Sequence, residues 1–492
     1  AAVVLTPLMQ VLDMTLANVA LPHMQAALGA NQESLSWVLT SYILASAVVL
    51  PITGWLSDRV GRRTLYLTSV GFFIVASVLC GMAATLEQMV LFRIAQGIFG
   101  AFLSPLAQTV LLDSTPPEKH GRAMAMFGMG VVLGPVLGPI LGGWLTENLN
   151  WRWVFYVNVP ICLVAMTGLW FLLPEVKRPQ RRLDVTGFVL LAVALASLQL
   201  MLDRGEGKDW FDSVEIWIEM IVAISALWMF IVHILTSHTP LFDRTLLGDR
   251  NMAVAAVLQG VTGAVMISSM ALLSLMLEGL LGYPVLDAGM LLATRGIGVI
   301  LMMGIVGRLL ERVAPSVLIA VGLLIISASL WEMSQWNLDL NGTRVGLNGF
   351  IQGLGIGLLF VPISAVAFAT LPARYRTDGS VLLNLTRSLG SSAGISIVLA
   401  MFNRNTAVSH SDLVQHITPY NMADLAALGL PEALSLPLLS ALNGEVTRQA
   451  TMIAFVDDFR FVMIFTLCTV PLALLIRRPH RKTKLDKTHV VE

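Results

Sequence analysis

The sequence predicts an all-α integral membrane protein with fourteen transmembrane helices, arranged as two six-helix bundles and two inserted helices. Three observations predict this class: the apolar composition, fourteen separate apolar stretches and an internal repeat. The chain has 492 residues, of which 56% are hydrophobic and 13% are charged, whereas about a quarter of the residues in soluble domains are charged. The composition therefore excludes an ordinary soluble protein.

The fourteen apolar stretches follow one another along the chain, with short polar breaks between them. Each stretch of about 17–25 residues can cross a hydrocarbon core of roughly 30 Å as an α-helix. We therefore predict one transmembrane helix at each centre. The centres lie near residues 13, 46, 74, 100, 133, 163, 194, 225, 265, 298, 325, 358, 390 and 466.

Two pairs of segments repeat at nearly the same offset. Residues 54–63 (GWLSDRVGRR) resemble residues 307–316 (GRLLERVAPS), and residues 96–117 resemble residues 352–373. Each copy lies eight predicted helices after its partner, which fits a duplication of six helices plus an inserted pair. Parallel halves of this kind are common in secondary transporters.

The repeat divides the chain into four predicted regions. They are an N-terminal six-helix bundle (1–173), a basic linker with two inserted helices (174–250), a C-terminal six-helix bundle (251–476) and a basic cytoplasmic tail (477–492). The tail is expected to contact anionic membrane lipids. The C-terminal bundle includes a predicted outer loop at 403–455, which is longer than most connections. This loop is either a docking surface for a periplasmic partner or a solvated cap on the outer mouth.

Lysine and arginine are concentrated in alternate connections, and cytoplasmic loops are the ones that retain these residues. We therefore predict a multi-pass protein of the inner (cytoplasmic) membrane with both termini in the cytoplasm. The predicted inner loops hold Arg59, Arg62, Arg63, Lys119, Arg122, Lys177, Arg178, Arg181, Arg182, Arg244, Arg250, Arg308, Arg312, Arg374 and Arg376. The predicted outer loops hold only Arg152, Arg204, Lys208, Arg344, Arg404 and Arg448.

Cysteine and histidine give no sign of a disulfide framework or a metal site. Cys80, Cys162 and Cys468 all fall inside predicted helices, where they serve as small apolar residues. The histidines match none of the usual zinc spacings. We expect no metal, no cofactor and no nucleic-acid partner.

Residues 12–22 read LDMTLANVALP and place Asp13 inside the first predicted helix. A charge within a membrane is costly, so an acid there is a functional candidate that can carry a proton. Arg93 in the fourth predicted helix is the natural partner, although the two depths differ by about 8 Å at 1.5 Å per residue. We predict that Asp13 and Arg93 couple proton binding to transport. The alternative is a structural acid hydrogen-bonded by Thr15 or Asn18.

The motif GWLSDRVGRR lies at the inner end of the second predicted helix. Its Asp58 can meet the positive end of a helix from the other half, an interaction worth roughly 0.3–2 kcal/mol. Its glycines allow close approach and a tight turn. The motif predicts a cytoplasmic latch, with a merely basic inner loop as the alternative. The latch residues are Gly54, Asp58, Arg59, Gly61, Arg62 and Arg63.

The fifth predicted helix contains GMGVVLGPVLGPILGGWL at 128–145. Glycines spaced by four share one helix face and permit close helix contact, while each proline bends the helix. We predict a pliant seam between the two halves. Its residues are Gly130, Gly134, Pro135, Gly138, Pro139, Gly142 and Gly143.

Further polar residues within predicted helices are candidates for the lining of a central cavity. Intramembrane charges are functional candidates by default, and their positive sign favours neutral or anionic lipophilic compounds. Alternatively, Arg387 pairs with a helix C-terminus or with Glu219 and stabilises the fold. We expect aromatic residues such as Tyr42 to contact the core or lipid. The cavity candidates are Gln96, Arg295, Asn384 and Arg387.

Together these motifs resemble the major facilitator superfamily over essentially the whole chain. GWLSDRVGRR resembles its loop signature, LFRIAQGIFGA (91–101) its helix-4 motif, and residues 128–145 the antiporter motif of its exporters. LDMTLANVALP and WRWVFYVNVP (151–160) resemble the fourteen-helix drug:proton antiporter branch. The phrase LDRG…DWF (202–211) and the long loop before the last helix resemble EmrB-type multidrug exporters. Met14 and Ala17 are small departures within the first motif.

The resemblance implies a major facilitator fold and a secondary active transporter, not an enzyme. It implies proton-coupled multidrug efflux by alternating access, antibiotic resistance, and coupling roles for the positions of Asp13 and Arg93. It also implies a periplasmic adaptor protein and an outer-membrane channel as partners. The alternatives are a dedicated exporter of one metabolite, such as a fatty acid, and a non-transporting membrane receptor or scaffold.

Overall fold

The computed structural model describes residues 2–116, 119–174, 182–416 and 436–476. Every regular element in these ranges is a helix. Fourteen helical spans are long and apolar enough to cross a membrane, and each predicted centre falls within one of them. The prediction of an all-α membrane protein with fourteen spans is confirmed.

The first six spans are α1 (Ala2–Leu28), α3 with η1 and α4 (Trp37–Val49, Leu50–Ile52, Thr53–Val60), α5 (Arg62–Met82), α6 with α7 (Leu86–Gly100, Leu103–Asp113), α8 (His120–Asn148), and α9 with α10 (Trp153–Tyr156, Asn158–Leu172). The inserted pair is α11 (Val185–Arg204) and α12 (Val214–Thr236). The last six spans are α14 with η5 (Arg250–Leu275, Met276–Leu280), α15 (Val285–Leu309), α16 (Pro315–Met333), α17 (Gly342–Ala369), η6 with α18 (Ala373–Tyr375, Arg376–Gln415), and α20 with η7 (Leu436–Thr469, Val470–Leu475). Four short helices lie in connections: α2 (Gln32–Leu35), η3 (Glu206–Lys208), η4 (Trp210–Asp212) and α13 (Arg244–Gly248).

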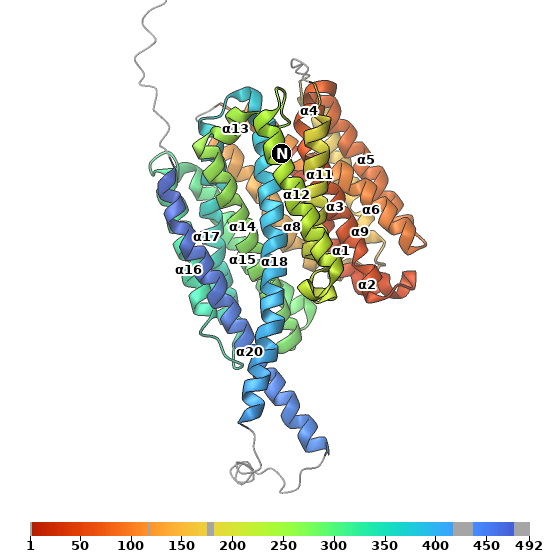
Figure 1. Cartoon of the computed structure of the whole chain (residues 1–492), viewed down its shortest axis with the longest axis vertical. Coiled ribbons are helices and arrows are strands. Elements are labelled where there is room, and N and C mark those ends of the chain that lie inside the picture. The colour runs from red at the N-terminus through yellow and green to blue at the C-terminus, as the bar shows by residue number, and fades with distance from the viewer. Residues whose placement is uncertain (1, 117–118, 175–181, 417–435, 477–492) are drawn as a thin grey trace, which may run out of the picture.

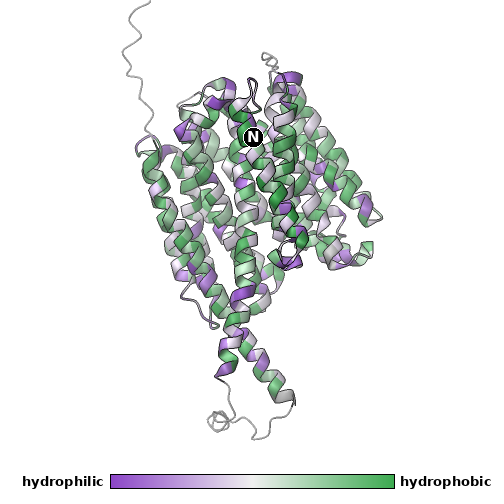
Figure 2. Cartoon of the chain, in the orientation of Figure 1, coloured by the Kyte–Doolittle hydropathy of each residue, from purple (hydrophilic) through white to green (hydrophobic). Residues whose placement is uncertain are grey.

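Successive spans run in opposite directions, so their connections alternate between two ends of the bundle (Figure 1). We call the end that holds the N-terminus the N-terminal face and the other end the opposite face. Hydrophobic residues cover the length of the bundle, whereas hydrophilic residues gather toward its two ends (Figure 2). Large apolar side chains such as Trp170, Phe171 and Trp228 are exposed along this length. Such a surface is suited to contact with lipid.

The two halves meet along two seams. At the first seam, α8 packs against α15. At the second, α18 packs against η1, α4 and α7, and α11 contacts both α3 and α18. The inserted helices α11 and α12 therefore lie over this second seam, which we call the covered seam (Figure 1).

Within the segment predicted as an outer loop at 403–455, for which short amphipathic helices were also expected, the described residues 403–415 and 436–455 belong to two long helices. α18 continues to Gln415 and α20 begins at Leu436, so both helices extend past the bundle on the opposite face (Figure 1). Residues 403–415 contain neither glycine nor proline, so a helix can continue through a polar sequence that hydropathy marks as a loop. Residues 417–435 and the predicted tail at 477–492 lie outside the described residues.

Candidate coupling site

Asp13 lies near the middle of α1 and is completely buried. Arg93 of α6, which is also completely buried, donates from Nη1 to Asp13 Oδ2 at 2.7 Å. Gln96, one turn later, donates from Nε2 to Asp13 Oδ1 at 2.8 Å. Asn158 of α10 donates to the same oxygen. Both carboxylate oxygens therefore have donors, and the cluster joins α1 to α6 and α10.

The guanidinium group of Arg93 has further partners in the first half. Its Nε donates to the carbonyl oxygen of Val38 at 3.0 Å, and its Nη1 donates to Gln96 Oε1 at 2.8 Å. Its Cζ lies 4.4 Å from the centre of the Tyr42 ring and 5.8 Å from that of Phe155. Aromatic faces attract a cation at these distances. Tyr42 is thus buried as expected, but it faces the charged cluster.

The cluster can link a protonation event to a change of packing. Removing one partner from a buried ion pair costs roughly 3–5 kcal/mol, because the other charge is left uncompensated. A proton on Asp13 removes the carboxylate charge while Arg93 stays positive. The contacts found here are therefore those of a carboxylate beside a cation, and loss of the carboxylate charge would leave Arg93 without its counter-charge.

The other members of the first motif do not bind Asp13. Thr15 donates to the carbonyl oxygen of Leu12 at 2.9 Å and lies 3.3 Å from that of Gly134, whereas Asn18 is exposed. The donors to Asp13 come from other helices, so the alternative of an acid satisfied by Thr15 or Asn18 does not describe this arrangement.

Sequence reasoning missed two polar members of the cluster. Ser77 of α5 accepts hydrogen bonds from Gln96 at 3.2 Å and from Asn158 at 2.9 Å. It donates in turn to the carbonyl oxygen of Phe155 at 2.9 Å. The signal for Asn158 was its amide within the apolar motif WRWVFYVNVP, whereas one serine in an apolar helix carries no comparable signal.

The glycines of α8 lie mainly against α1, which corrects the prediction that they form the seam between the halves. A Cβ added to each of four glycines would contact a residue of α1. The pairs are Gly130 with Val4, Gly134 with Val11, Gly138 with Thr15, and Gly142 with Val19. The seam lies on another face of α8, where Val136 and Pro139 approach Gly296 and Gly289 of α15. Gly143 has nothing within 4 Å of an added Cβ. Glycines spaced by four in α8 therefore allow α1, the helix that carries Asp13, to pack closely against α8.

A cross-half ion cluster lies on the N-terminal face. Asp113, at the end of α7, accepts a hydrogen bond from Arg62 of α5 and, at 2.7 Å, from Nη1 of Arg376 at the start of α18. Arg62 is a predicted latch residue, whereas Asp113 and Arg376 were not predicted as sites. An acid that follows an apolar stretch, as in LLDS, has no distinctive spacing and resembles an ordinary helix end.

Two of the remaining latch residues, Arg59 and Arg63, contact aromatic rings of their own half. Arg59 lies over the ring of Trp55 at 5.9 Å, and Arg63 lies over the ring of Trp170 at 5.6 Å. Gly61 has φ +97°, a conformation that favours glycine because it has no Cβ. The helix that carries Gly54 and Asp58, α4, packs against α18, and the latch role of Asp58 stays a prediction.

We expect Asp113→Asn to loosen closure of the N-terminal face, because the charge between Arg62 and Arg376 is lost. Ion pairs exposed to water contribute about 0.2–1 kcal/mol each, which predicts a several-fold increase in opening. The measurement is the maleimide labelling rate of Ser380→Cys, a position buried at the covered seam, in a Cys468→Ala background. Exposed Glu311→Gln on the same face is the control, and labelling of Asp113→Asn at the control rate would contradict the latch.

Two arginines in the C-terminal half have no acidic partner among the residues that the structure describes. Buried Arg295 of α15 donates from Nη2 to Ser269 Oγ of α14 at 2.6 Å, and its Nε has no partner. Half-buried Arg387 of α18 donates from Nη2 to Asn384 Oδ1 at 3.0 Å. Within the described part of the chain, these two side chains are available to an anionic or polar group.

The other cavity candidates are engaged elsewhere. Gln96 belongs to the Asp13 cluster, and Asn384 lies 3.4 Å from Gln108 Oε1 across the covered seam. Glu219, weighed as a partner for Arg387, lies instead 3.8 Å from Arg204. Gln352, which the internal repeat aligns with Gln96, is completely buried, and neither of its amide atoms has a hydrogen-bond partner among the described residues.

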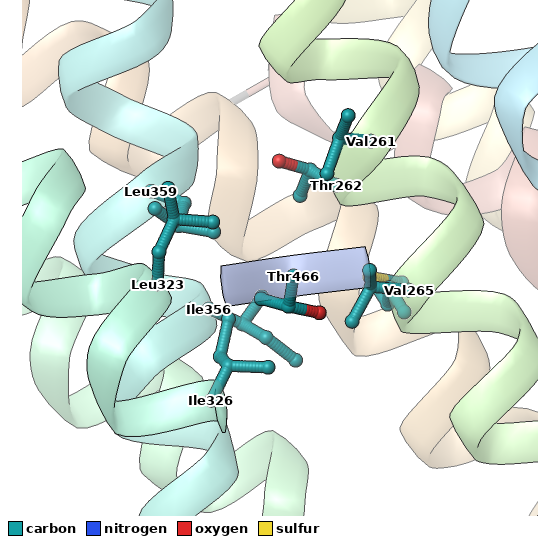
Figure 3. Close-up of a pocket in the computed structure, with 9 residues that line it drawn as sticks. Val261, Thr262, Val265, Leu323, Ile326, Ile356, Leu359 and Thr466 are labelled. Atoms are coloured by element: carbon teal, nitrogen blue, oxygen red, sulfur yellow. The ribbon is translucent and has the colours of Figure 1, made fainter. Parts of the chain in front are cut away.

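A pocket within the C-terminal half lies apart from all these residues. Figure 3 shows it between α14, α16, α17 and α20. Its lining is apolar except for Thr262 and Thr466. Because it offers no charged group, we assign no ligand to it.

Comparisons with known proteins fit this architecture. The family model of the Major Facilitator Superfamily matches residues 3–395. The Multidrug export protein EmrB of Haemophilus influenzae is 36% identical over 423 residues, which cover 85% of this chain and 83% of that protein. The Fatty acid resistance protein FarB of Neisseria gonorrhoeae is 33% identical over 479 residues, covering 96% and 94%. A crystal structure of the human organic anion transporter MFSD10 (TETRAN) covers 94% of this chain and 98% of its own, with a TM-score of 0.59 and 15% identity. That last likeness concerns the fold alone.

Proposed function

Because this chain belongs to the major facilitator superfamily, we propose that it is a proton-driven antiporter that exports several lipophilic compounds by alternating access. The observation that carries the proposal is the Asp13–Arg93 pair, which is buried and fully hydrogen-bonded at the carboxylate. The relatives named as multidrug export proteins support the substrate range.

The proposed cycle uses the energetic cost of an unpaired buried charge. A proton that reaches Asp13 neutralises it and leaves Arg93 without its counter-charge. The conformation in which the pair is closed then loses stability relative to its alternative. Loss of the proton on the other side of the membrane restores the pair, so proton movement down its gradient drives the two conformations in turn. A ligand or proton can shift the equilibrium only by its differential affinity for the two states.

The proposed substrate region lies between the halves, near Arg295 and Arg387. Two cationic side chains without acidic partners favour neutral or anionic lipophilic compounds over cations. A second candidate function is a dedicated exporter of one metabolite such as a fatty acid. It is favoured by the likeness to FarB, which is named for fatty acid resistance.

We place the protein in the inner membrane with its N-terminal face and both termini in the cytoplasm. The lysine and arginine bias between the two sets of connections supports this orientation. The opposite face would then carry the extensions of α18 and α20 into the periplasm, where we propose that a periplasmic adaptor docks and leads to an outer-membrane channel. Retained adaptor pull-down after deletion of residues 410–450 would contradict that docking site.

Transport into proteoliposomes tests the function. We expect several chemically unrelated lipophilic compounds to move only when a proton gradient is imposed, and transport to stop when nigericin collapses the gradient. In a matched dye pair, we expect the anion to be transported several-fold faster than the cation. Transport of a fatty acid alone would favour the dedicated exporter, and gradient-independent movement would reject antiport.

A further inference from the structure

The inserted helix α11 is bonded to both halves of the molecule near the opposite face. Toward α18, Gln199 donates to Ser392 Oγ at 3.0 Å, and the carbonyl oxygen of Leu202 accepts from Ser396 at 2.7 Å. Toward α3, the guanidinium of Arg204 lies 5.9 Å from the ring of Trp37. Helix α11 therefore fastens the two halves together across the covered seam (Figure 1).

Asp203 and Gln199 stand at the centre of this junction. Gln199 is completely buried, and its Nε2 donates to Asp203 Oδ1 at 2.8 Å. The side chain of Thr40 in α3 also hydrogen-bonds the carboxyl group of Asp203. The two remaining oxygens, Gln199 Oε1 and Asp203 Oδ2, are both buried, and neither lies within ordinary hydrogen-bond distance of a donor in the described part of the chain. Both are acceptors when Asp203 is charged, so these two oxygens lack a donor. Buried polar atoms without partners are rare in folded proteins and call for an explanation.

One proton supplies the missing donor. A protonated carboxyl group both donates and accepts, and a primary amide does the same, so a neutral Asp203 can donate from Oδ2 while Oδ1 keeps its bond from Gln199. We propose that Asp203 is a second proton-binding site, which lies on α11 beside the covered seam. The proton comes from solvent, since Asp203 is only half-buried.

The charged groups around Asp203 are directed elsewhere. Arg204 pairs with Glu215 and Glu219 of α12, and Lys208 of η3 lies 3.7 Å from Glu215. Glu206 of η3 accepts from Asn403 of α18 at 2.6 Å. The facing parts of α3 (37–49) and α18 (388–403) contain no Asp, Glu, Lys, Arg or His. No described cation therefore pairs with Asp203 and holds it in its charged form.

Asp203 and Asp13 are thus opposite in character. The carboxylate of Asp13 has donors at both oxygens and a cation beside it, whereas Asp203 has an orphaned oxygen and no cation. The contacts of Asp13 are thus those of a carboxylate, whereas those of Asp203 leave room for a proton. Loss of the proton at Asp203 leaves two buried acceptor oxygens without a described donor, next to the bond from Gln199 to Ser392. A role of this proton in the transport cycle rests on the proposed function, but proton binding at Asp203 does not.

Infrared difference spectroscopy tests the site on the full chain in lipid, without substrate. We expect a carbonyl stretch of a protonated carboxyl group that titrates with pH in the wild type and is absent in Asp203→Asn. Gln199→Leu is expected to move this band to higher frequency, because the bond to the carbonyl oxygen is lost. Exposed Asp212→Asn in η4 is the matched control and should keep the wild-type spectrum.

Three outcomes would overturn the proposal. They are a wild-type band in folded Asp203→Asn, an unshifted band in Gln199→Leu, and the absence of any titrating carboxyl band in the wild type. If Asp203→Asn fails to fold, Asp203→Glu decides the matter, since it should retain a titrating band at a displaced frequency. None of these readings depends on transport, so a failed export assay leaves them intact.

Discussion

Asp13→Asn is expected to abolish the proton release that follows addition of a lipophilic substrate to the purified protein in weak buffer. Asparagine keeps the size of the side chain but cannot exchange a proton, and it leaves Arg93 buried without its counter-charge. The closed pair should lose roughly 3–5 kcal/mol of its stability for that reason. We expect gradient-driven transport to fall to background, while substrate binding is retained.

The control for this experiment is Asp287→Asn, an exposed acid at the start of α15. It should release protons as the wild type does. Thermal unfolding and size-exclusion profiles check that both variants are folded. Proton release of equal size in folded Asp13→Asn and the wild type would place the exchanging group elsewhere, and the Asp13 cluster would then be purely structural.

Gly138→Ala is expected to destabilise the N-terminal half and to reduce transport at least tenfold. The added Cβ would lie 2.1 Å from Oγ1 and 2.6 Å from Cβ of Thr15, so α1 has to move away from α8. Overpacking of this kind typically costs about 1–3 kcal/mol. Because Thr15 is two residues from Asp13, the shift should also displace the carboxylate from Arg93. Thermal unfolding and transport assays measure the two effects.

Gly143→Ala is the matched control, since nothing lies within 4 Å of a Cβ added there. Replacing a helical glycine with alanine stabilises a helix by roughly 0.5–1 kcal/mol where space allows. The two substitutions in one helix should therefore act in opposite directions. Equal loss of stability in both variants would show that close contact with α1 is not the reason why α8 contains these glycines.

The number and position of the spans could be predicted from the sequence because membrane thickness sets their length. A polar continuation of a helix has no such signature, which is why the stretches 403–415 and 436–455 were expected to hold at most short helices within an outer loop and not the extensions of two spans. Hydropathy identifies the part of a helix that lies in lipid. The backbone hydrogen bonds of the helix can continue beyond that part. Residues 175–181 and 477–492 lie outside the described part of the chain, so the predictions made for them stand untested.

The candidate site was predictable where an isolated charge sits in an apolar helix. Asp13 and Arg93 carry that signal, and the structure brings them together. The sequence predicted a difference in depth between the two residues, and the long arginine side chain spans it. Asp113 and Asp203 lie at helix ends, where acids are common. Partners on other helices distinguish Asp113, and a buried oxygen without a described donor distinguishes Asp203. The glycines of α8 were recognised as a packing face, but which helix they face depends on tertiary structure. The coupling, latch and cavity roles of these residues remain proposals.

The length of helix α18 allows it to transmit movement from one end of the molecule to the other. It runs unbroken from Arg376 to Gln415 without a proline, a length of roughly 60 Å at 1.5 Å per residue. One end is tied to Asp113 by Arg376, and the other projects past the bundle beside α20. A rod of this length that pivots by about 10° at its midpoint moves each tip by roughly 5 Å. If the N-terminal face opens, we therefore expect α18 to carry the movement to its far tip on the opposite face of the bundle.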